Sequence, residues 1–557
     1  MIKTKTLVTI LFLVLLVSFP VFYLIFARNV TGKEKIVGTH YTASTWAPSF
    51  WSNLDIYEVG KDFAAIKENG FNTVIIIVPW TGFQTSVTPI LCFDDYFVLL
   101  NSLFVRAKEA GLNVILRIGY AHEIGVDSVP SHYERAVDLF NDSTLWNAWT
   151  DYLGRLHNLT SKYDNFLFGF LTWEDFFFID LTRVPLEKRT SLADRTGYQK
   201  YLENHGLHEI SEMYGESFSS YKEIPIPSFN SSAVPLFYKF WNQFLIAIYQ
   251  RSKEYFPKLS MEVRMHCDPS SEFKKYHCHE PTFNLGGVGD LTIIYYTSSL
   301  AAPNQGDRTS ANDAIFRLKN LLNWVKSHTG NAIFIDQFNF FDNTPGFEQD
   351  TKIASGELPK FIEKSFEILR DDTIGYALWT MKDVRGNLIK NGSFERGTLG
   401  WRIHNGEVLT RDSTQQHGLL LGNMGTLRQD IGCGSYVHPV INRKDVFFRF
   451  RFKVKKAGQN PSRLILKVID NRGKEIFHQQ IHVVAKNYET IALEKLPLFS
   501  SATLELSNSV QDIILDDLVL FFVIQQNGIY DVSGEPKSFR DNIVYLNRKL
   551  STVRNPR

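Results

Sequence analysis

The sequence predicts an α/β fold: a (β/α)8 barrel with an all-β domain inserted between its eighth strand and its eighth helix, behind an N-terminal transmembrane helix. Short apolar segments alternate with helical ones over residues 35–386. Residues 387–526 change to short segments of alternating polarity, and residues 527–557 return to a helical pattern. With 557 residues, 44% of them hydrophobic, the chain can form a large domain and a smaller one.

The N-terminal segment predicts a membrane anchor. Residues 7–26 carry no charge and match the length of about 20 residues that a helix needs to cross roughly 30 Å of hydrocarbon. Lys3 and Lys5 precede it, which favours a cytoplasmic amino terminus. The run is longer than the roughly 7–15 residues of a signal-peptide core, and no A-x-A cleavage motif follows. We expect residues 1–34 to be a single-pass anchor and linker in the cell membrane, with the bulk of the chain extracytoplasmic. Secretion after signal cleavage is the alternative.

The barrel prediction depends on eight apolar segments rich in Val, Ile and Phe. They show little alternation, which is typical of strands buried on both faces. The segments are residues 36–41, 73–80, 114–120, 166–173, 261–267, 291–296, 332–338 and 374–379. Helical stretches between them end at Gly70 and Gly111, as helices often do. A doubly wound open sheet is the alternative, but "GTHYTAST" after the first segment is not a glycine-rich phosphate turn.

The all-β domain is predicted from a change of period after the eighth strand. Segments such as "VFFRFRFKV" and "SRLILKVID" alternate with a period of two and show no helical period. The pattern continues to "IILDDLVLFF", and an amphipathic segment follows. Because the eighth strand otherwise lacks its helix, we expect this segment to be the last helix of the barrel. The domains are then 35–386, 387–526 and 527–557.

The charge balance and the cysteines limit the partners and the redox chemistry that we expect. Lysine plus arginine (60) nearly cancel aspartate plus glutamate (59), so we expect no nucleic-acid partner. Cys267 and Cys278 are close enough in sequence for a disulfide in an oxidising compartment. His266, His277 and His279 lie beside them, but the spacing matches no common zinc pattern. We favour a disulfide or two free thiols over a zinc site, and the choice between the disulfide and the free thiols stays open.

Polar and aromatic residues follow the predicted strands at the ends where a barrel gathers its functional groups. Carboxylates, aromatic rings and histidines that converge on one rim indicate a carbohydrate cleft more than a redox or phosphate site. The residues at these ends are His40, Trp80, Tyr120, His122, Glu123, Glu174, Asp175, Asp268, Tyr295, Asp336, Gln337 and Trp379. Those expected to bind substrate are His40, Trp80, Tyr120, His122, Glu123, Asp268, Tyr295 and Trp379.

Four of these strand ends resemble the clan of retaining glycoside hydrolases built on TIM barrels, which includes cellulase-like, xylosidase-like and galactosidase-like families. "TWED" matches the position of the clan's acid/base glutamate with Glu174. "IDQFN" matches the position of its nucleophile with Gln337, and "GYALWT" supplies Trp379 for its late tryptophan. Tyr295 matches a tyrosine that often hydrogen-bonds the nucleophile. The resemblance covers residues 35–385 and 527–550.

Two departures from the clan's pattern bear on the chemistry. Trp173 stands where an asparagine usually precedes the acid/base, and Gln337 is an amide, which cannot form the usual glycosyl ester. Retaining hydrolysis needs two carboxyl groups about 5 Å apart. Asp336, Glu123 or Asp268 could supply the second carboxylate; otherwise the sugar's acetamido group attacks, or the site only binds. Strand alternation puts the side chains of residues 336 and 337 on opposite faces unless a bulge intervenes.

The all-β domain has a resemblance of its own. "NLIKNGSFERGTLGW" and "IILDDLVLFF" resemble the first and last strands of jelly-roll carbohydrate-binding modules. That resemblance implies a structural calcium held by Glu395 and Asp516, since oxygen ligands suit this hard cation. A plain β-sandwich without a metal is the alternative.

Together with the predicted anchor, the two resemblances imply a membrane-anchored glycoside hydrolase that acts on an extracytoplasmic poly- or oligosaccharide, with Glu174 as general acid and then general base and no cofactor for catalysis. The competing hypothesis is a catalytically inactive, glycosidase-like protein that binds a glycan to tether or guide it, which Gln337 favours. A purely structural ectodomain would leave the polar residues at the strand ends unexplained.

Overall fold

The structure is a computed structural model. It describes residues 34–43, 45, 47, 50–51, 53–119, 130, 132–172, 181–182, 184–228, 230–263, 291–296, 306–344, 351–394, 397–410, 417–432, 446–521 and 524–555. The expected anchor, residues 7–26, lies outside these ranges. Within them, no helix combines the length and the apolar character that crossing a membrane requires.

Eight parallel strands close into a barrel, as the sequence predicts. Each strand pairs with its neighbour in the chain order, and the last pairs with the first. The strands are β1 (Ile36–His40), β2 (Thr73–Val78), β5 (Asn113–Ile118), β6 (Phe166–Leu171), β7 (Leu259–Val263), β8 (Leu291–Tyr296), β10 (Ala332–Phe338) and β12 (Gly375–Leu378). The predicted bounds are right to within one or two residues for most strands, and β7 begins two residues earlier than expected.

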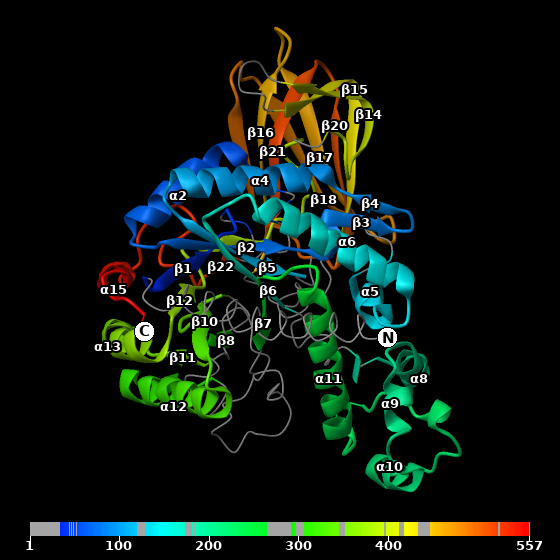
Figure 1. Cartoon of the computed structure of the whole chain (residues 1–557). Helices are drawn as coiled ribbons and strands as arrows, with labels where there is room; N and C mark the ends of the chain where they lie inside the picture. Colours follow the sequence, from blue (N-terminus) through cyan, green and yellow to red (C-terminus); the bar gives the residue numbers. More distant parts are fainter. Residues whose placement is uncertain are drawn as a thin grey trace, which may run out of the picture.

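Helices lie around the outside of the barrel (Figure 1). They are α2 (Ile56–Glu68), α4 (Asp94–Glu109), α5 (His132–Asp138), α6 (Ser143–Thr160), α11 (Val234–Lys253), α12 (Ala311–Thr329), α13 (Leu358–Asp372) and α15 (Arg540–Ser551). The glycines predicted to end two of them, Gly70 and Gly111, have φ angles of +81° and +67°, which a residue without a Cβ adopts most readily. Three shorter helices precede α11 and project from the barrel in Figure 1: α8 (Leu186–Arg195), α9 (Tyr198–Leu202) and α10 (Leu207–Tyr214).

The barrel strands are buried on both faces, which explains their nearly continuous apolar sequences. Alternate side chains point to opposite sides of each strand. One set packs with the surrounding helices in the largest apolar cluster. The other set fills the barrel interior with Ile75, Ile115, Phe168, Phe170, Leu291, Ile293, Phe334 and Ala377.

The helix that follows the β-domain in the sequence packs on the barrel. Helix α15 lies beside α13 and β1 (Figure 1). The Asn547 side chain donates a 2.9 Å hydrogen bond to the carbonyl of Asn69, and the Tyr376 hydroxyl donates to Asn547. Contacts between α15, the end of α2 and β12 therefore close the barrel across residues far apart in sequence. The boundaries at 386/387 and 526/527 stay predictions.

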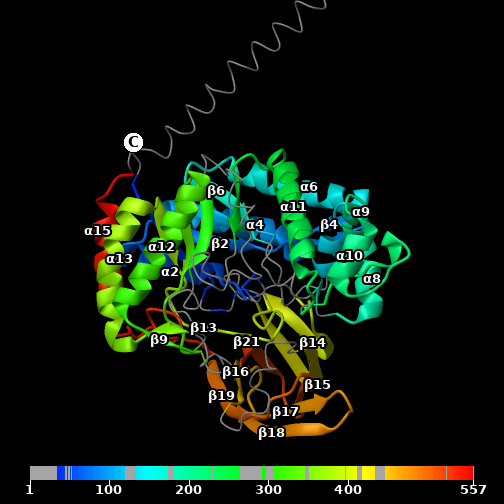
Figure 2. The ribbon, with the colours of Figure 1, turned by 90° about the horizontal axis from the view of Figure 1, so that it is seen from below.

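A separate β-sandwich follows the eighth barrel strand (Figure 2). Its antiparallel strands are β14 (Arg402–Thr410), β15 (His417–Gly432), β16 (Phe448–Lys456), β17 (Ser462–Asp470), β18 (Glu475–Val483), β19 (Glu489–Leu496), β20 (Ser501–Asn508) and β21 (Ile513–Phe521). Buried and exposed residues alternate along β16 and β17, as the sequence pattern predicts. The buried residues form an apolar core of their own, which includes Phe450, Leu466, Leu504 and Leu515.

Two short strands join the sandwich to the barrel. β13 (Val384–Arg385) precedes the sandwich, β22 (Ile524–Gln525) follows it, and the two pair antiparallel. The entry and the exit of the sandwich therefore lie side by side.

The segment that resembles the first strand of a jelly roll is not a regular strand in its described residues. It instead runs beside β21, where the amide of Leu388 donates to the carbonyl of Leu520 (2.7 Å). Gly392 accepts from the amide of Leu518 at 3.0 Å. A Cβ at Gly392 would stand 2.0 Å from the Leu518 carbonyl oxygen, so this close approach requires glycine.

Candidate active site

A layer of polar side chains lies in the barrel interior toward the carboxyl ends of the strands. Arg117 lies two residues after interior Ile115 on β5, and Asp336 lies two residues after interior Phe334 on β10. Because alternate residues on a strand face the same side, both polar side chains point inward above the apolar interior. We refer to five buried residues as the polar layer: His40, Arg117, Thr172, Glu262 and Asp336.

The polar layer contains a buried acid–base pair. His40 Nε2 lies 2.7 Å from Asp336 Oδ1, and neither side chain is exposed to solvent. His40 ends β1 and Asp336 lies on β10, so the pair spans the strand β12 that separates them in the barrel. The ring of Trp379, just after β12, meets the His40 ring edge-on with centroids 4.8 Å apart. The structure thus brings together three residues that the sequence predicts at the site.

A second buried pair adjoins the first. Arg117 Nη2 lies 3.3 Å from Glu262 Oε2, and the side chains are 1% and 0% exposed. The Thr172 hydroxyl donates to the same Glu262 oxygen at 2.5 Å and accepts from Arg117 Nη2 at 3.1 Å. Buried charges are tolerated only when they are paired and hydrogen-bonded, as these are.

The charges around Asp336 keep its carboxyl ionised. Burial raises the pKa of Asp336, because it disfavours the charged form. The charge and the hydrogen bond of His40, with the charge of Arg117, outweigh burial and hold the pKa of Asp336 below its ordinary value of 3.8. A hydrogen bond with the Glu262 carboxyl lowers the pKa of Asp336 further.

A β-bulge in β10 explains how the backbone places residues 336 and 337. Asp336 pairs with Tyr295 and Phe338 pairs with Tyr296, so Gln337 is an extra residue between them. Gln337 has a φ of +51°, in the left-handed region that only a few per cent of residues other than glycine adopt. The sequence predicts opposite faces for Asp336 and Gln337 unless a bulge intervenes, and the bulge is present. Asp336 faces the interior, and Gln337 is buried with 8% exposure.

Trp80 lies in the packed core and not on an open cleft, contrary to the expectation that it binds substrate. The chain leaves β2 at Pro79 and turns into the short helix α3 (Trp80–Phe83). There the fully buried Trp80 packs edge-on against Trp149 with ring centroids 4.9 Å apart. Its indole N–H donates to Gln84 at 2.8 Å, so the ring has no face for a sugar. His40 is likewise buried and not on the rim, whereas Trp379 is partly exposed.

Several predicted residues lie outside the described part of the chain. They are Tyr120, His122, Glu123, Glu174, Asp175, Cys267, Asp268, Cys278 and Glu395, with the histidines 266, 277 and 279. Tyr295 is on β8, and its side chain is not described. Thr172 of the polar layer stands two residues before Glu174 in the sequence.

Sequence reasoning missed three members of the polar layer: Arg117, Thr172 and Glu262. Arg117 and Glu262 are lone charged residues within apolar strands, "NVILRI" and "LSMEV". Burying a single charge within such a strand is costly unless an opposite charge pairs with it. The opposite charges of the residues on β5 and β7 could therefore have indicated that the two form a pair. Thr172 carries no comparable signal.

Of the two residues expected to hold calcium, the structure describes Asp516. Asp516 on β21 is 6% exposed, and its Oδ1 accepts a 2.8 Å hydrogen bond from the backbone amide of Asp517. Among the described residues, no three acidic, histidine or cysteine side chains lie together as metal ligands. Calcium takes six to eight oxygens, so the part of the sandwich that the structure describes does not fit it.

No family model matches the chain, and no curated protein matches it. Among solved structures, the chain is similar to a GH5_18 enzyme from Streptomyces cattleya in complex with GlcNAc, with 15% identity over 64% of this chain and 72% of that chain, at a TM-score of 0.41. A GH5_18 enzyme from Bifidobacterium longum subsp. infantis gives 15% identity over 63% and 70%, at 0.39.

The remaining part of the chain is similar to the carbohydrate-binding module TmCBM61 in complex with beta-1,4-galactotriose. The identity is 17% over 24% of this chain and 98% of that chain, at a TM-score of 0.20. The similar structures are thus glycoside hydrolases and a carbohydrate-binding module.

Proposed function

We propose that this chain is a retaining glycoside hydrolase that acts on an extracytoplasmic poly- or oligosaccharide. The observation that carries the proposal is the buried polar layer at the carboxyl ends of the barrel strands, where Asp336 is held ionised by His40. Retaining hydrolysis needs one ionised carboxylate as nucleophile and one protonated carboxylic acid. Asp336 supports the first role, and Glu174, two residues beyond Thr172, is our candidate for the second.

In this proposal Asp336 takes the role that Gln337 cannot perform. An Asp336 oxygen attacks the anomeric carbon while the bond from that carbon to the leaving oxygen breaks. Glu174 gives its proton to the leaving oxygen. Water then attacks the anomeric carbon, Glu174 takes a proton from that water, and the Asp336 carboxylate is released.

The other members of the polar layer would position and tune Asp336. The 2.7 Å contact with His40 fixes the orientation of the carboxylate and lowers its pKa, so it attacks without first losing a proton. Arg117 and Thr172 hold Glu262, which in turn hydrogen-bonds Asp336. We place the sugar against the partly exposed ring of Trp379, since aromatic faces stack on sugar rings. The residues Tyr120, His122, Glu123, Asp268 and Tyr295 remain candidates for further contacts.

A glycan-binding protein without hydrolase activity is the second candidate, and two observations favour it. Gln337 stands at the position where the resembling clan has its nucleophile. Asp336 is fully buried against His40, which is also how a purely structural carboxylate is held.

Four further assignments belong to the same proposal. Residues 7–26 would anchor the chain in the cell membrane, and residues 387–526 would be a domain inserted between the eighth strand and the last helix. That domain would be a jelly-roll module that binds the same glycan. Glu395 and Asp516 would hold a structural calcium together with ligands outside the described residues.

Initial rates of glycan cleavage by the wild type and three variants test the proposal. The substrates are a panel of aryl β-glycosides and oligosaccharides. Glu174→Gln and Asp336→Asn should each reduce the rate by about 10²–10⁴-fold. The first variant cannot transfer the proton, and the second has no carboxylate to act as nucleophile. Glu363→Gln, at an exposed position on α13, is the control and should leave the rate unchanged.

Gln337→Glu separates the two candidate functions. In a working enzyme that uses Asp336, a second carboxylate at the adjacent residue would crowd two negative charges and reduce the rate. In an inactive binding protein, the same change would restore the clan's nucleophile and create slow cleavage. Wild-type cleavage that survives Glu174→Gln unchanged would remove Glu174 from the mechanism.

A further inference from the structure

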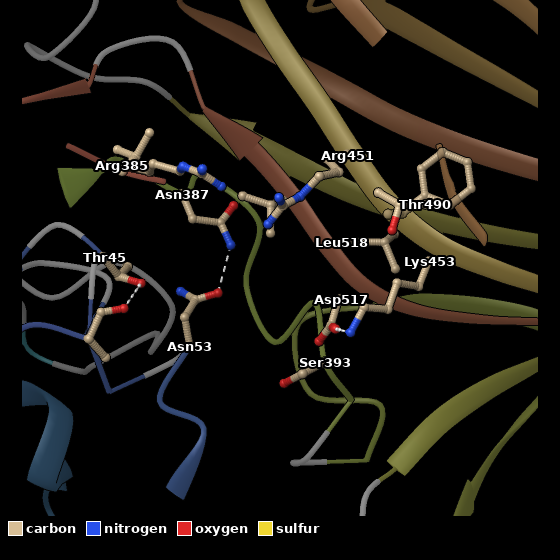
Figure 3. Close-up of a pocket in the computed structure, with 14 residues that line it drawn as sticks. Thr45, Asn53, Arg385, Asn387, Ser393, Arg451, Lys453, Thr490, Asp517 and Leu518 are labelled. Carbon is tan, nitrogen blue, oxygen red and sulfur yellow. Dashed lines mark hydrogen bonds and ion pairs between the residues drawn. The ribbon is translucent and has the colours of Figure 1, made fainter. Parts of the chain in front are cut away.

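A cavity lies between the barrel and the sandwich (Figure 3). Its volume is about 360 Å³, within the range of small-molecule sites. The barrel side of its wall comes from the segment after β1, with Ala43 and Asn53, and the sandwich side comes from β16, β19 and β21. Ala43 stands three residues after His40, so the cavity opens near the barrel end that carries the polar layer.

Positive charge concentrates in this cavity. Arg385 from β13 and Arg451 and Lys453 from β16 line it. The acidic residue of the lining, Asp517, already pairs with Lys453 at 2.5 Å. Neither Arg385 nor Arg451 forms an ion pair within the described ranges, and Figure 3 shows their side chains extending toward each other from opposite walls.

The fold holds these like charges together at a cost. Burial lowers the pKa of Arg385, and repulsion by Arg451 and by the neighbouring Arg449 lowers it further. Asp531 opposes that effect and does not cancel it. An anion between the two guanidinium groups would relieve the repulsion, and the planar fork of arginine suits oxyanions.

The rest of the wall suits a sugar. Ser393 and Thr490, which each carry a hydroxyl, also line the cavity. The side-chain amide of Asn387 bridges to Asn53 at 2.6 Å and so ties the entry of the sandwich to the barrel wall. A few polar groups at fixed positions in a concave site are what a specific ligand needs.

We propose that this cavity binds an acidic saccharide, with the anionic oxygens of one sugar between Arg385 and Arg451 and the sugar hydroxyls against Ser393 and Thr490. The inference rests on the proposed function in one respect, namely that the ligand is a glycan. The inference names the substrate class of that function, which is a polysaccharide that contains acidic sugars. The cavity would bind one sugar of the chain while the barrel binds another.

Binding to the full chain tests the inference by calorimetry with four probes. Trigalacturonate and glucose 6-phosphate carry a carboxylate and a phosphate, and galactotriose and inorganic phosphate are the neutral and the sugar-free controls. We expect an acidic saccharide to bind more tightly than both controls, and more weakly as NaCl rises. Binding of trigalacturonate would identify the anion as a carboxylate, and binding of glucose 6-phosphate would identify it as a phosphate.

Two variants locate the binding. The double variant Arg385→Gln/Arg451→Gln should weaken acidic-saccharide binding by at least about tenfold, because charged hydrogen bonds are lost. Arg463→Gln, an exposed arginine on β17, is the matched control and should bind as the wild type does. The double variant loses like-charge repulsion, so its unfolding midpoint should not fall, and lost binding cannot then be attributed to misfolding.

Four results would overturn the inference: no binding of either acidic saccharide, equal binding of galactotriose, equal binding of inorganic phosphate, or unchanged binding by the double variant. These results are independent of the catalytic proposal. Binding of an acidic saccharide by the wild type without any cleavage would contradict the hydrolase and retain the cavity's ligand.

Discussion

Replacing Asp336 should destabilise the barrel by an amount that depends on pH. The Asp336–His40 contact is 2.7 Å long and fully buried, so it is a charge-assisted hydrogen bond shielded from water. Asp336→Asn keeps an acceptor for His40 but removes the charge, which should cost about 1–2 kcal/mol. Asp336→Ala leaves His40 buried without this partner and opens a small cavity, which should cost about 3–5 kcal/mol.

The sign of the pH dependence follows from the lowered pKa of Asp336. A carboxyl whose folded pKa lies below its unfolded value of about 3.9 contributes stability above that value and loses it as the pH falls through the folded pKa. The full difference between wild type and Asp336→Asn should therefore appear at pH 7. It should shrink below about pH 4, because the unfolded wild type then takes up a proton at Asp336 that the folded protein does not yet bind.

Urea unfolding followed by tryptophan fluorescence measures these differences. The barrel and the sandwich have separate cores, so the barrel transition is fitted by itself. For a barrel of about 350 residues, a loss of 3 kcal/mol corresponds to a fall of roughly 4 °C in Tm. Equal stability of wild type and Asp336→Ala, or a difference that does not change between pH 7 and pH 3, would refute the account of the pair.

Four further outcomes are expected. Arg117→Met should cost about 3–5 kcal/mol because it leaves Glu262 buried without its cation, and adding Glu262→Leu should recover part of that loss in a double-mutant cycle; additive losses would contradict the coupling. A chain lacking residues 387–526, with Gly386 joined to Asn527, should keep the barrel's helical circular dichroism, and an insoluble or unfolded product would count against an inserted domain. The full-length protein should need detergent for extraction and keep its N-terminal segment; N-terminal sequencing that starts near residue 29 would replace the anchor with a cleaved signal. EDTA should lower the unfolding midpoint of the sandwich if its resemblance to calcium-holding modules extends to the metal, and an unchanged midpoint would remove the calcium.

The barrel could be predicted from sequence because the apolar pattern of each strand agrees with its burial on both faces in the fold. β8 and β10 match the expected segments 291–296 and 332–338, since a strand buried on both faces must be apolar along its whole length. Residues 387–401 were predicted less well. Their pattern resembles a strand, yet in residues 387–394 the close approach at Gly392 and the contact with β21 give an irregular segment.

The polar layer was harder to predict than the strands. His40, Asp336 and Trp379 could be placed together because all three follow from strand ends that meet at one edge of the barrel. Arg117 and Glu262 come from β5 and β7, which flank β6 in the barrel, and a single sequence does not state that their side chains meet in the interior. Trp80 was misplaced because the turn at Pro79 directs it outward into the core with Trp149.

The stereochemistry of cleavage tests the central claim most directly. Proton NMR of the first product released by the wild type shows whether its anomeric configuration matches that of the substrate. If Asp336 attacks and water follows, two displacements leave the configuration retained. An inverted product would mean that Asp336 does not form the glycosyl ester, and the absence of any product across the substrate panel would contradict the hydrolase and favour the glycan-binding protein.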